Sequence, residues 1–491
     1  MESLKVLFAS PEVVPFVKTG GLADVSGMLP KKLAAMGHSV KVFLPDYATI
    51  SRKDSADARK DIAVDVPDDG VSRQMTVRRM DGRVPQLEYL FLGNSHYFNR
   101  RSLYVDPETG LDYPDNHGRF SFFCRGLLET IKSLDWMPDI IHANDWQMAL
   151  LPTYLATVYK NDPFFAKTRT VYTVHNLAYQ GVFPPEAFPS LGLPVELFRP
   201  LGPLEFWGKV NFMKSAVVLA TVISTVSERY AAEIQSSDEY GYGLEGVLRA
   251  RNKDLFGIIN GVDYSVWSPS RDKLIPFKFS PSNLSGKKKD KIELVNRLGL
   301  PFREQTPLIG MITRLADQKG LDLIAAAADD LFQLDLQMIV LGTGDRKYHE
   351  LLMRLEKTYP DKLKALLTFD DQMAHWIEAG ADMFLMPSRY EPCGLNQLYS
   401  LKYGTLPIVR ATGGLADTVE NIDPQTGAGT GFVFERYDPE EMLDAIKRGI
   451  AYFSRKRAWG KIMKAAMSRD YSWDASAKKY VELYTKALAK A

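Results

Sequence analysis

The chain is poor in cysteine and has no long apolar run. Only two of its 491 residues are cysteine, Cys124 and Cys393. That is too few for a disulfide framework or a cysteine-rich zinc site, and it is typical of a protein kept in a reducing compartment. No apolar run approaches the roughly 20 residues of a membrane-spanning helix, and the N-terminus lacks the pattern of a signal peptide. We therefore expect a cytoplasmic protein that does not associate with membranes.

The chain also lacks an excess of charge of either sign. Lysine and arginine total 61 and aspartate and glutamate total 60, so no global basic excess is available to hold a nucleic acid or an anionic membrane. A local cationic site for an anionic substrate remains compatible with this balance. We expect no nucleic-acid partner.

Several catalytic motifs are missing as well. The sequence has no P-loop, no Gly-x-Ser-x-Gly and no Gly-x-Gly-x-x-Gly after its first strand-like run. It has no histidine and cysteine cluster with metal-ligand spacing, so we expect no metal and no cofactor. The missing dinucleotide fingerprint disfavours a nicotinamide dehydrogenase, a class that α/β alternation alone would allow.

What the sequence does have is regular alternation of short apolar runs with amphipathic stretches. The runs at Leu4–Ala9 and Ser39–Leu44 are typical of buried strands and flank a helical pattern at Leu22–Met36. Three runs between residues 62 and 92 predict an antiparallel excursion, and a helix is expected near Leu204–Leu219. Such alternation predicts a parallel sheet covered on both faces.

A second α/β series begins after the polar stretch Ser280–Asp290, with a strand at Leu308–Thr313. The length of the chain allows two or three domains. We predict two doubly wound domains, residues 1–255 and 256–469, whose C-terminal strand edges face a ligand-binding cleft. The basic run Lys287–Lys289 is interpreted as a solvated loop, with a weak contact to substrate phosphate as the alternative.

One short motif occurs twice, each time between a strand and a helix. Thr-Gly-Gly-Leu-Ala-Asp spans residues 19–24 and again 412–417, once in each predicted domain. Paired glycines let the backbone approach a ligand, and a helix N-terminus offers free N–H groups and a positive dipole end. A pair of tight structural turns is the alternative. We favour a diphosphate site that uses Lys18, Gly20, Gly21, Thr412, Gly413 and Gly414.

Two cations and a carboxylate follow strands of the second domain. Arg314 and Lys319 lie five residues apart and can grip one diphosphate, neutralising the charge that builds on a leaving group. Surface solvation is the alternative for both. Glu391 can accept hydrogen bonds from sugar hydroxyls, unless it only caps the next helix. Cys393 has no histidine nearby in sequence, so we interpret it as a packed or substrate-lining thiol.

Polar residues also follow two strands of the first domain. His142-Ala143-Asn144-Asp145-Trp146 comes after one strand, and His175-Asn176 after the next. A single histidine is more often structural than catalytic, but several polar groups at one sheet edge favour a binding site. Asp145, His175 and Asn176 are therefore candidate site residues.

These motifs together resemble the bacterial glycogen synthase and plant starch synthase family. The resemblance covers essentially the whole chain and is carried, in order and spacing, by Lys18–Asp24, His175–Gly181, Asn260–Asp263, Arg314 with Lys319, and Glu391–Leu395. It implies the GT-B fold, two Rossmann-like domains around a deep cleft, with a C-terminal helix at about residues 470–491 returning to the first domain. It also implies a retaining transfer of glucose from ADP-glucose to the non-reducing end of an α-1,4-glucan such as glycogen, without a metal.

The resemblance further implies roles for single residues. His175 would touch the glucose, Arg314 and Lys319 would stabilise the departing ADP, and Glu391 would bind the donor sugar. The remaining implied contacts are Lys18 at the diphosphate, Asp24 near the acceptor, Asn260 near the sugar, Tyr104 near the base, and Cys393, Gly394 and Leu395 along the donor glucose.

The chain departs from the family pattern at three positions. The wider group of GT-B transferases has Glu-x7-Glu, whereas Tyr399 stands eight residues after Glu391 here, as in glycogen and starch synthases. Asn396 replaces a frequent threonine. Asn144 replaces the middle histidine of His-Ala-His-Asp-Trp, so a role that rests on that histidine cannot be carried over.

Two alternatives remain open at this point. One is a retaining GT-B transferase that uses UDP-glucose or a different acceptor, and the other is a non-catalytic glucan-binding protein. The sequence shows no carboxylate pair of the glycosidase type. The resemblance to the family implies a front-face route, in which the leaving phosphate helps to deprotonate the acceptor.

Overall fold

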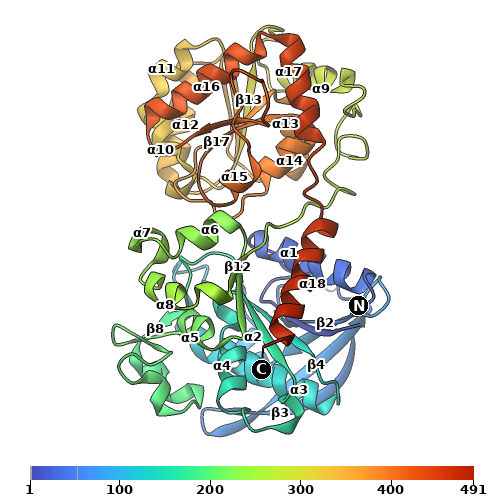
Figure 1. The fold of residues 1–491 in the computed structure, drawn as a ribbon, viewed down its shortest axis with the longest axis vertical. Helices are drawn as coiled ribbons and strands as arrows, with labels where there is room; N and C mark the ends of the chain where they lie inside the picture. The colour runs from blue at the N-terminus through green and yellow to red at the C-terminus, as the bar shows by residue number, and fades with distance from the viewer. Residues whose placement is uncertain (1–2, 52, 491) are drawn as a thin grey trace. The chain divides into compact units, whose positions relative to one another are not determined.

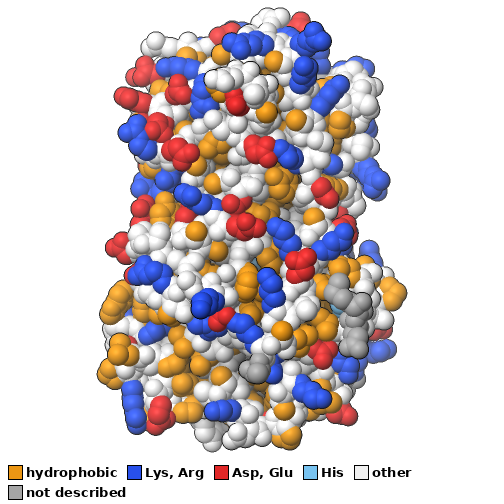
Figure 2. All heavy atoms as spheres, in the orientation of Figure 1, with side chains coloured by type: hydrophobic (Ala, Val, Ile, Leu, Met, Phe, Trp, Pro, Cys, Tyr) orange, Lys and Arg blue, Asp and Glu red, His pale blue; other side chains and the backbone are white. Residues whose placement is uncertain are grey.

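The computed structural model describes residues 3–51 and 53–490, which form two compact units. Unit 1 consists of the described residues of Met1–Val226, Ala231–Ile258 and Trp473–Ala491, and unit 2 of Ser227–Tyr230 and Ile259–Ser472. Each unit is built on a mostly or fully parallel sheet with helices around it (Figure 1). The doubly wound α/β architecture predicted from the sequence is thereby confirmed. In the view of Figure 2, acidic and basic side chains are interspersed, as the balanced charge predicts.

Unit 1 is built on a nine-stranded sheet with the order β12-β11-β7-β6-β1-β2-β5-β4-β3. Its strands are β1 Lys5–Ala9, β2 Ser39–Pro45, β3 Arg59–Asp68, β4 Val71–Asp81, β5 Leu87–Gly93, β6 Ile140–Asn144, β7 Arg169–Val174, β11 Val222–Thr225 and β12 Leu255–Gly257. All neighbours pair in parallel except β3 with β4 and β4 with β5. The antiparallel excursion predicted between residues 62 and 92 is therefore confirmed.

The helices of unit 1 cover this sheet and include the last helix of the chain. They are α1 Gly21–Ala35, α2 Ser95–Phe98, α3 Asn116–Ser133, α4 Leu150–Ala156, α5 Phe212–Leu219, α7 Asp238–Gly241, α8 Glu245–Ala250 and α18 Trp473–Leu488, while α6 Glu228–Glu233 begins in unit 2. Short 3-10 helices are η1 Trp146–Met148, η2 Pro163–Phe165, η3 Pro185–Ala187, η4 Pro189–Leu191, η5 Val195–Phe198 and η6 Asn252–Asp254. Helix α18 packs on α1 and β7 (Figure 1). Its Tyr484 hydroxyl lies 2.8 Å from His142 Nδ1 in the core.

A small antiparallel sheet of unit 1 corrects one prediction. Its strands are β8 Val182–Phe183, β9 Glu205–Phe206 and β10 Lys209–Asn211, in the order β8-β10-β9. The helix expected at Leu204–Leu219 is therefore wrong in its first half, and α5 begins only at Phe212. Gly208, at φ +77°, turns the chain into the hairpin, and the Asn211 side chain caps α5 by accepting the Lys214 N–H at 2.9 Å.

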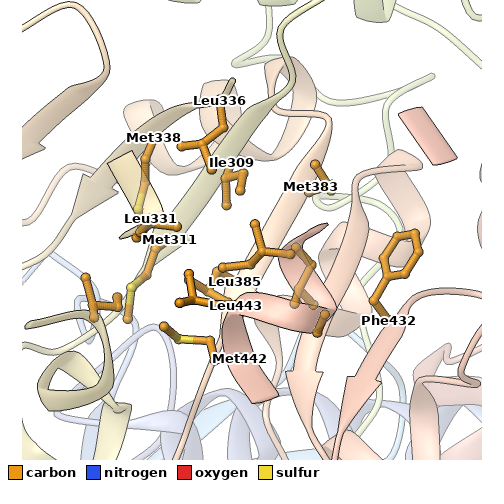
Figure 3. Close-up of a cluster of buried hydrophobic side chains, with 14 of the residues drawn as sticks. Ile309, Met311, Leu331, Leu336, Met338, Met383, Leu385, Phe432, Met442 and Leu443 are labelled. Atoms are coloured by element: carbon orange, nitrogen blue, oxygen red, sulfur yellow. The ribbon is translucent and has the colours of Figure 1, made fainter. Parts of the chain in front are cut away.

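Unit 2 is built on a six-stranded, fully parallel sheet with the order β15-β14-β13-β16-β17-β18. Its strands are β13 Leu308–Ile312, β14 Gln337–Leu341, β15 Leu363–Leu366, β16 Met383–Met386, β17 Leu406–Arg410 and β18 Phe432–Phe434. Its helices are α9 Ser285–Arg297, η7 Asp317–Lys319, α10 Leu321–Ala326, α11 Ala328–Gln333, α12 Arg346–Thr358, α13 Asp371–Gly380, α14 Asn396–Tyr403, α15 Gly413–Thr418, α16 Pro439–Phe453 and α17 Lys456–Met467. Strand and helix side chains interdigitate in its core, as Met311, Leu385 and Leu443 do in Figure 3. Buried strands of this kind are apolar on both faces because helices cover both sides of the sheet.

The basic run Lys287–Lys289 is only in part what the sequence predicts: Lys288 and Lys289 are exposed as expected, but the run is helical and Lys287 is not solvated. It lies in α9, where Lys287 is buried and donates hydrogen bonds to Thr405 Oγ1 at 2.6 Å and Ala379 O at 3.0 Å. Burial lowers the pKa of Lys287 to about 8. The carbonyls at the end of α13 provide hydrogen bonds that offset part of the cost of burying an ammonium group.

Candidate functional site

Most candidate residues of each unit gather at the C-terminal edge of its sheet. In unit 1 these follow β1, β6 and β7, which are neighbours in the sheet, and in unit 2 they follow β13, β16 and β17, also neighbours. Open α/β sheets bind ligands at this edge. Tyr104 lies between α2 and α3, and Asn260 follows β12 at the start of unit 2. The groups of each unit are described separately below.

In unit 1 a buried carboxylate holds the first Thr-Gly-Gly turn. Glu12, 4% exposed, accepts hydrogen bonds from the Thr19 N–H and hydroxyl, both at 2.5 Å, and from the Gly20 N–H at 3.2 Å. The same carboxylate accepts from the Tyr104 hydroxyl at 2.8 Å. Tyr104 is thereby fixed to the loop of Lys18. In this structure the Gly20 N–H is used internally, while Gly20 and Gly21 are exposed.

Lys18 and Asp24 form an ion pair at 2.8 Å beside this turn. Their side chains keep 51% and 31% of their surfaces exposed, so water screens the pair and its net contribution to folding is about 0–1 kcal/mol. An anion that approaches the start of α1 can therefore compete with Asp24 for the Lys18 ammonium at little energetic cost.

Asp145 and His175 are brought together at the ends of β6 and β7. Asp145 adopts φ +56°, and its carboxylate accepts hydrogen bonds from the backbone N–H groups of His175, at 2.7 Å, and of Asn176. Burial raises the pKa of Asp145 to about 7. The Asn176 side chain in turn accepts the Ala178 N–H at 3.1 Å. Asp145 and Asn176 thus fix the loop that presents His175.

Asn144 determines which nitrogen of His175 carries the proton. The Asn144 Nδ2 group donates to the Ala9 carbonyl at 3.0 Å, and this leaves its Oδ1 as an acceptor facing His175 Nε2 at 3.0 Å. The His175 Nε2 must then be the protonated nitrogen. Burial lowers the pKa of His175 to about 3, so the ring is neutral at physiological pH. No hydrogen bond among the described residues uses Nδ1, whose lone pair can accept one from a ligand.

His142, the other histidine of this edge, has a structural role. It is completely buried, with Nε2 2.6 Å from Thr173 Oγ1 and Nδ1 2.8 Å from the Tyr484 hydroxyl. Burial lowers its pKa to about 3. Both ring nitrogens are satisfied inside the core, so His142 does not face a ligand.

In unit 2 a lysine and a glutamate meet across two strand-end loops. Lys319, after β13, donates to Glu391, after β16, at 2.6 Å, and the Ser388 hydroxyl donates to the same carboxylate oxygen at 2.9 Å. Glu391 is only 7% exposed. Arg314 is exposed, and its guanidinium makes only a long hydrogen bond of 3.5 Å to Gln318 Oε1 among the described residues, which leaves it open to an anion. The predicted cations thus lie on one loop beside the predicted carboxylate.

The second Thr-Gly-Gly turn packs against the loop of Glu391. A Cβ on Gly413 would lie 2.0 Å from the Glu391 carbonyl oxygen, and one on Gly414 would lie 1.9 Å from that of Cys393. The Gly414 N–H donates to the Glu391 carbonyl at 3.1 Å, and Thr412 is completely buried. The two copies of the motif therefore differ: nothing lies within 4 Å of the Cβ position of Gly20, whereas these glycines are needed for close internal packing.

Cys393 and Asn260 are in contact within unit 2. The Asn260 N–H donates to the Cys393 thiol, whose pKa burial raises to about 12, so Cys393 is a neutral packed thiol rather than a nucleophile. The side-chain Oδ1 of Asn260 is buried and has no hydrogen-bond partner among the described residues. Most buried polar atoms of folded proteins are hydrogen-bonded, so this oxygen is available to accept a further hydrogen bond. Gly394 and Leu395, at the start of α14, are partly exposed.

The two other departures from the family pattern also have structural explanations. Asn396 donates to the Ile312 carbonyl at 2.6 Å and so joins α14 to the end of β13. The ring of Tyr399 stacks on Trp267 with centroids 4.0 Å apart and an angle of 2° between the planes. One face of Tyr399 is therefore covered by protein.

Sequence reasoning missed several residues of these edges. Glu12 and Ser388 hold the predicted groups in place, and Phe369, three residues after β15, is 84% exposed. Glu12 and Ser388 lie just before the Lys18 and Glu391 motifs but outside them, and only tertiary contacts reveal their partners. The sequence signal that could have identified Phe369 as a candidate is its position, an aromatic residue shortly after a strand.

Two kinds of feature are absent from the described residues, 3–51 and 53–490. These residues contain no group of three or more His, Cys, Asp or Glu side chains placed to bind a metal ion. Nor do they contain a helix with the length and apolar character needed to cross a bilayer.

Comparisons with known proteins agree with this architecture. Residues 5–250 match the family described as starch synthase catalytic domain, and residues 295–463 match glycosyl transferases group 1. The solved catalytic domain of starch synthase IV from Arabidopsis thaliana, bound to ADP and acarbose, superposes with a TM-score of 0.89 at 33% identity, covering 100% of both chains. A sucrose-phosphate synthase from Thermosynechococcus elongatus, at 16% identity and a TM-score of 0.61, shares the fold. The protein is therefore a glycosyltransferase of the GT-B fold.

Full-length relatives define the family. The chain is 49% identical to a glycogen synthase of Koribacter versatilis over 485 residues, covering 99% of this chain and 98% of the relative. It is 46% identical to a glycogen synthase of Thermotoga maritima, covering 99% of both. The chain belongs to the glycogen and starch synthase family.

Proposed function

We propose that this enzyme transfers glucose from ADP-glucose to the non-reducing end of an α-1,4-glucan, with retention of configuration and release of ADP. The observation that carries the proposal is the cation pair of unit 2, an exposed Arg314 guanidinium on the same loop as a Lys319 ammonium held 2.6 Å from Glu391. The starch synthase structure at 33% identity, which holds ADP and acarbose, supports a nucleotide-sugar donor and a glucan acceptor.

In this proposal unit 2 binds the donor. Arg314 and Lys319 contact the diphosphate, Glu391 accepts hydrogen bonds from glucose hydroxyls, and a further hydroxyl satisfies the buried Oδ1 of Asn260. Gly394, Leu395 and the packed Cys393 line the sugar. The exposed ring of Phe369 follows β15, two strands or about 10 Å from β13, and offers the base a face on which to stack.

Unit 1 contributes the acceptor side in this proposal. His175 uses its free Nδ1 to accept a hydrogen bond from a sugar hydroxyl, and Asp145 and Asn176 position it. Lys18 exchanges its Asp24 partner for substrate phosphate, Gly20 leaves open space for that approach, and Gly21 is exposed beside it. The contribution of Tyr104 is to hold this turn through Glu12.

The proposed reaction proceeds on one face of the sugar. The bond from glucose C1 to the phosphate oxygen breaks, the acceptor O4 bonds to C1 on the same face, and the O4 proton passes to the leaving phosphate. Arg314 and Lys319 stabilise the charge that develops on that phosphate. Glu391 is engaged by Lys319 and Ser388, and Asp145 by backbone N–H groups, so neither carboxylate is free to act as a nucleophile. Trapping a glucosyl-enzyme on either residue would contradict this route.

A donor comparison tests the proposal. With glycogen as acceptor, radiolabelled ADP-glucose should give incorporation at least about tenfold faster than UDP-glucose, a difference of about 1.4 kcal/mol in transition-state stabilisation. Faster transfer from UDP-glucose would establish the alternative donor. No transfer from either donor, with glycogen binding intact, would indicate a glucan-binding protein instead.

We further propose that the enzyme works in the cytoplasm and without a metal. Both cysteines are free and buried, which suits a reducing compartment. The cationic side chains of unit 2 can supply the charge stabilisation that a metal ion provides in other transferases.

A further inference from the structure

The hairpin between β9 and β10 has an unexpected residue at its turn. Phe206 pairs with Lys209, so Trp207 and Gly208 occupy the two central positions, with φ values of +49° and +77°. A two-residue turn with positive φ at both positions favours Asn-Gly or Asp-Gly. A tryptophan there is disfavoured, because an L-residue in the left-handed region brings its Cβ close to the following carbonyl. Such local conflicts tend to mark functional positions.

The Trp207 ring is supported by its neighbours but remains largely open to solvent. It is 77% exposed, and its centroid lies 4.3 Å from that of Phe206. Gly243, at φ +84°, leaves room for it, since a Cβ at Gly243 would lie 2.5 Å from the ring. The tryptophan is therefore held in place rather than loosely projecting.

Buried hydrogen bonds connect this hairpin to the loop of His175. The Gln180 side chain, five residues after His175, donates to the Tyr242 carbonyl at 3.1 Å and accepts from Asn211 Nδ2 at 2.6 Å. Gln180 is 7% exposed and Asn211 is completely buried. One amide thus fixes both the hairpin and the turn of Gly243 relative to the candidate site.

The same unit exposes further apolar side chains near the small sheet. Val182, on β8, is 41% exposed, and Tyr179, three residues earlier, is 56% exposed. Figure 2 shows hydrophobic side chains along the lower left edge, over the part of unit 1 that carries β8 in Figure 1. Tryptophan and tyrosine are enriched at binding interfaces because they combine a large apolar body with a polar group.

We propose that Trp207 is a stacking platform for a sugar ring of the α-glucan acceptor. The inference rests on the proposed function and deepens it by naming a contact outside the strand-end loops. Pyranose rings present apolar C–H faces that pack against aromatic rings, and an uncharged polymer suits an aromatic surface connected to the His175 loop. A platform of this kind would favour long acceptors, because several glucose units are needed to reach beyond the reacting end.

The variant Trp207→Asn tests this contact without disrupting the hairpin. Asparagine is a preferred residue at this turn position, so the variant should unfold at a temperature no lower than that of the wild type. Its dissociation constant for maltoheptaose should rise at least about fivefold, the change that marks an energetically important interface residue. The matched control is Leu201→Asn. Leu201 is 95% exposed at φ +66° in the same unit, lacks an aromatic ring, and should tolerate the change with unchanged affinity.

Binding is measured by calorimetry with maltoheptaose and by migration in native gels that contain glycogen, with the oligomeric state followed by light scattering. Wild-type affinity in the Trp207→Asn variant, or an equal loss in Leu201→Asn, would overturn the proposal. So would a change of oligomeric state without a change in glucan affinity, which would assign the ring to an interface between chains. Glucose transfer by the wild type is assayed separately, so failure of the proposed function would be seen independently of glucan binding.

Discussion

At the scale of single residues, the Lys319–Glu391 pair is the group on which the proposed chemistry most depends. Lys319→Ala should lower kcat by roughly 10²–10³-fold, because a preorganised cation at the departing phosphate is lost. The folded structure should persist, since Lys319 is partly exposed. Initial rates with saturating ADP-glucose and glycogen, together with circular dichroism, check both statements.

Lys288→Ala is the matched control for this change. Lys288 forms an exposed ion pair with Glu304 on the same unit, and its loss should leave the rate unchanged. A Lys319→Ala enzyme with near-normal turnover would remove the residue from the mechanism.

Asn144 makes a second prediction at this scale, on pH dependence. With a pKa of about 3, His175 is protonated in only about 0.1% of molecules at pH 6, so its protonation does not limit the wild-type rate there. Asn144→Asp places a carboxylate beside the Nε2–H group, stabilises the imidazolium and raises the pKa. Activity should then fall with decreasing pH in a range where the wild type is still active.

The control for this prediction is Asn144→Leu, which removes the acceptor without adding charge. It should lower the rate at all pH values while the shape of the pH profile stays the same. Identical acid limbs in the wild type and the Asn144→Asp variant would show that Asn144 does not control the protonation of His175.

At the scale of elements, the two Thr-Gly-Gly turns have different roles: the second is needed for internal packing, and the first leaves room for a ligand. Gly414→Ala would place a Cβ 1.9 Å from the Cys393 carbonyl oxygen, so the loop of Glu391 must shift, with a loss of about 1–3 kcal/mol in stability. Gly20→Ala meets no atom within 4 Å and should leave stability unchanged, but it should raise KM for the donor. Thermal unfolding and donor saturation curves distinguish the two variants. Equal effects on stability would contradict the difference between the turns.

Elements that are determined by local sequence were predicted correctly, whereas those that depend on distant contacts were not. Strands such as β1 and helices such as α1 were predictable because apolar periodicity is local. The β9–β10 hairpin was missed because Trp207 is not a residue that predicts a tight turn. In the absence of a turn signal, the sequence after Leu204 resembles a continuous helix. Lys287 was misjudged because its acceptors come from α13 and from Thr405, far away in sequence. Likewise, the role of Glu12 depends on partners that only the folded loop brings to it.

At the scale of the whole molecule, the proposed absence of a metal gives a direct test. Dialysis against a chelator should leave the rate of glucose transfer unchanged, because in the proposed reaction side-chain cations stabilise the departing ADP. The measurement is the rate before and after chelation, with added magnesium as a third arm. A loss of activity that a divalent cation restores would show that a metal takes part.

The path of the chain has a consequence for how the protein forms during synthesis. Helix α18 belongs to unit 1, and Tyr484 completes the hydrogen bonds of His142, 342 residues earlier. Unit 2, residues 259–472 together with the short segment 227–230, leaves the ribosome before α18 does and can bury its own sheet first. During synthesis, unit 1 cannot complete its fold until residues 473–488 have emerged, so the surfaces of α1 and β7 that α18 covers stay exposed to solvent until then. The N-terminal unit therefore completes its fold after unit 2, and its exposed apolar surface is a site at which chaperones would have to prevent aggregation.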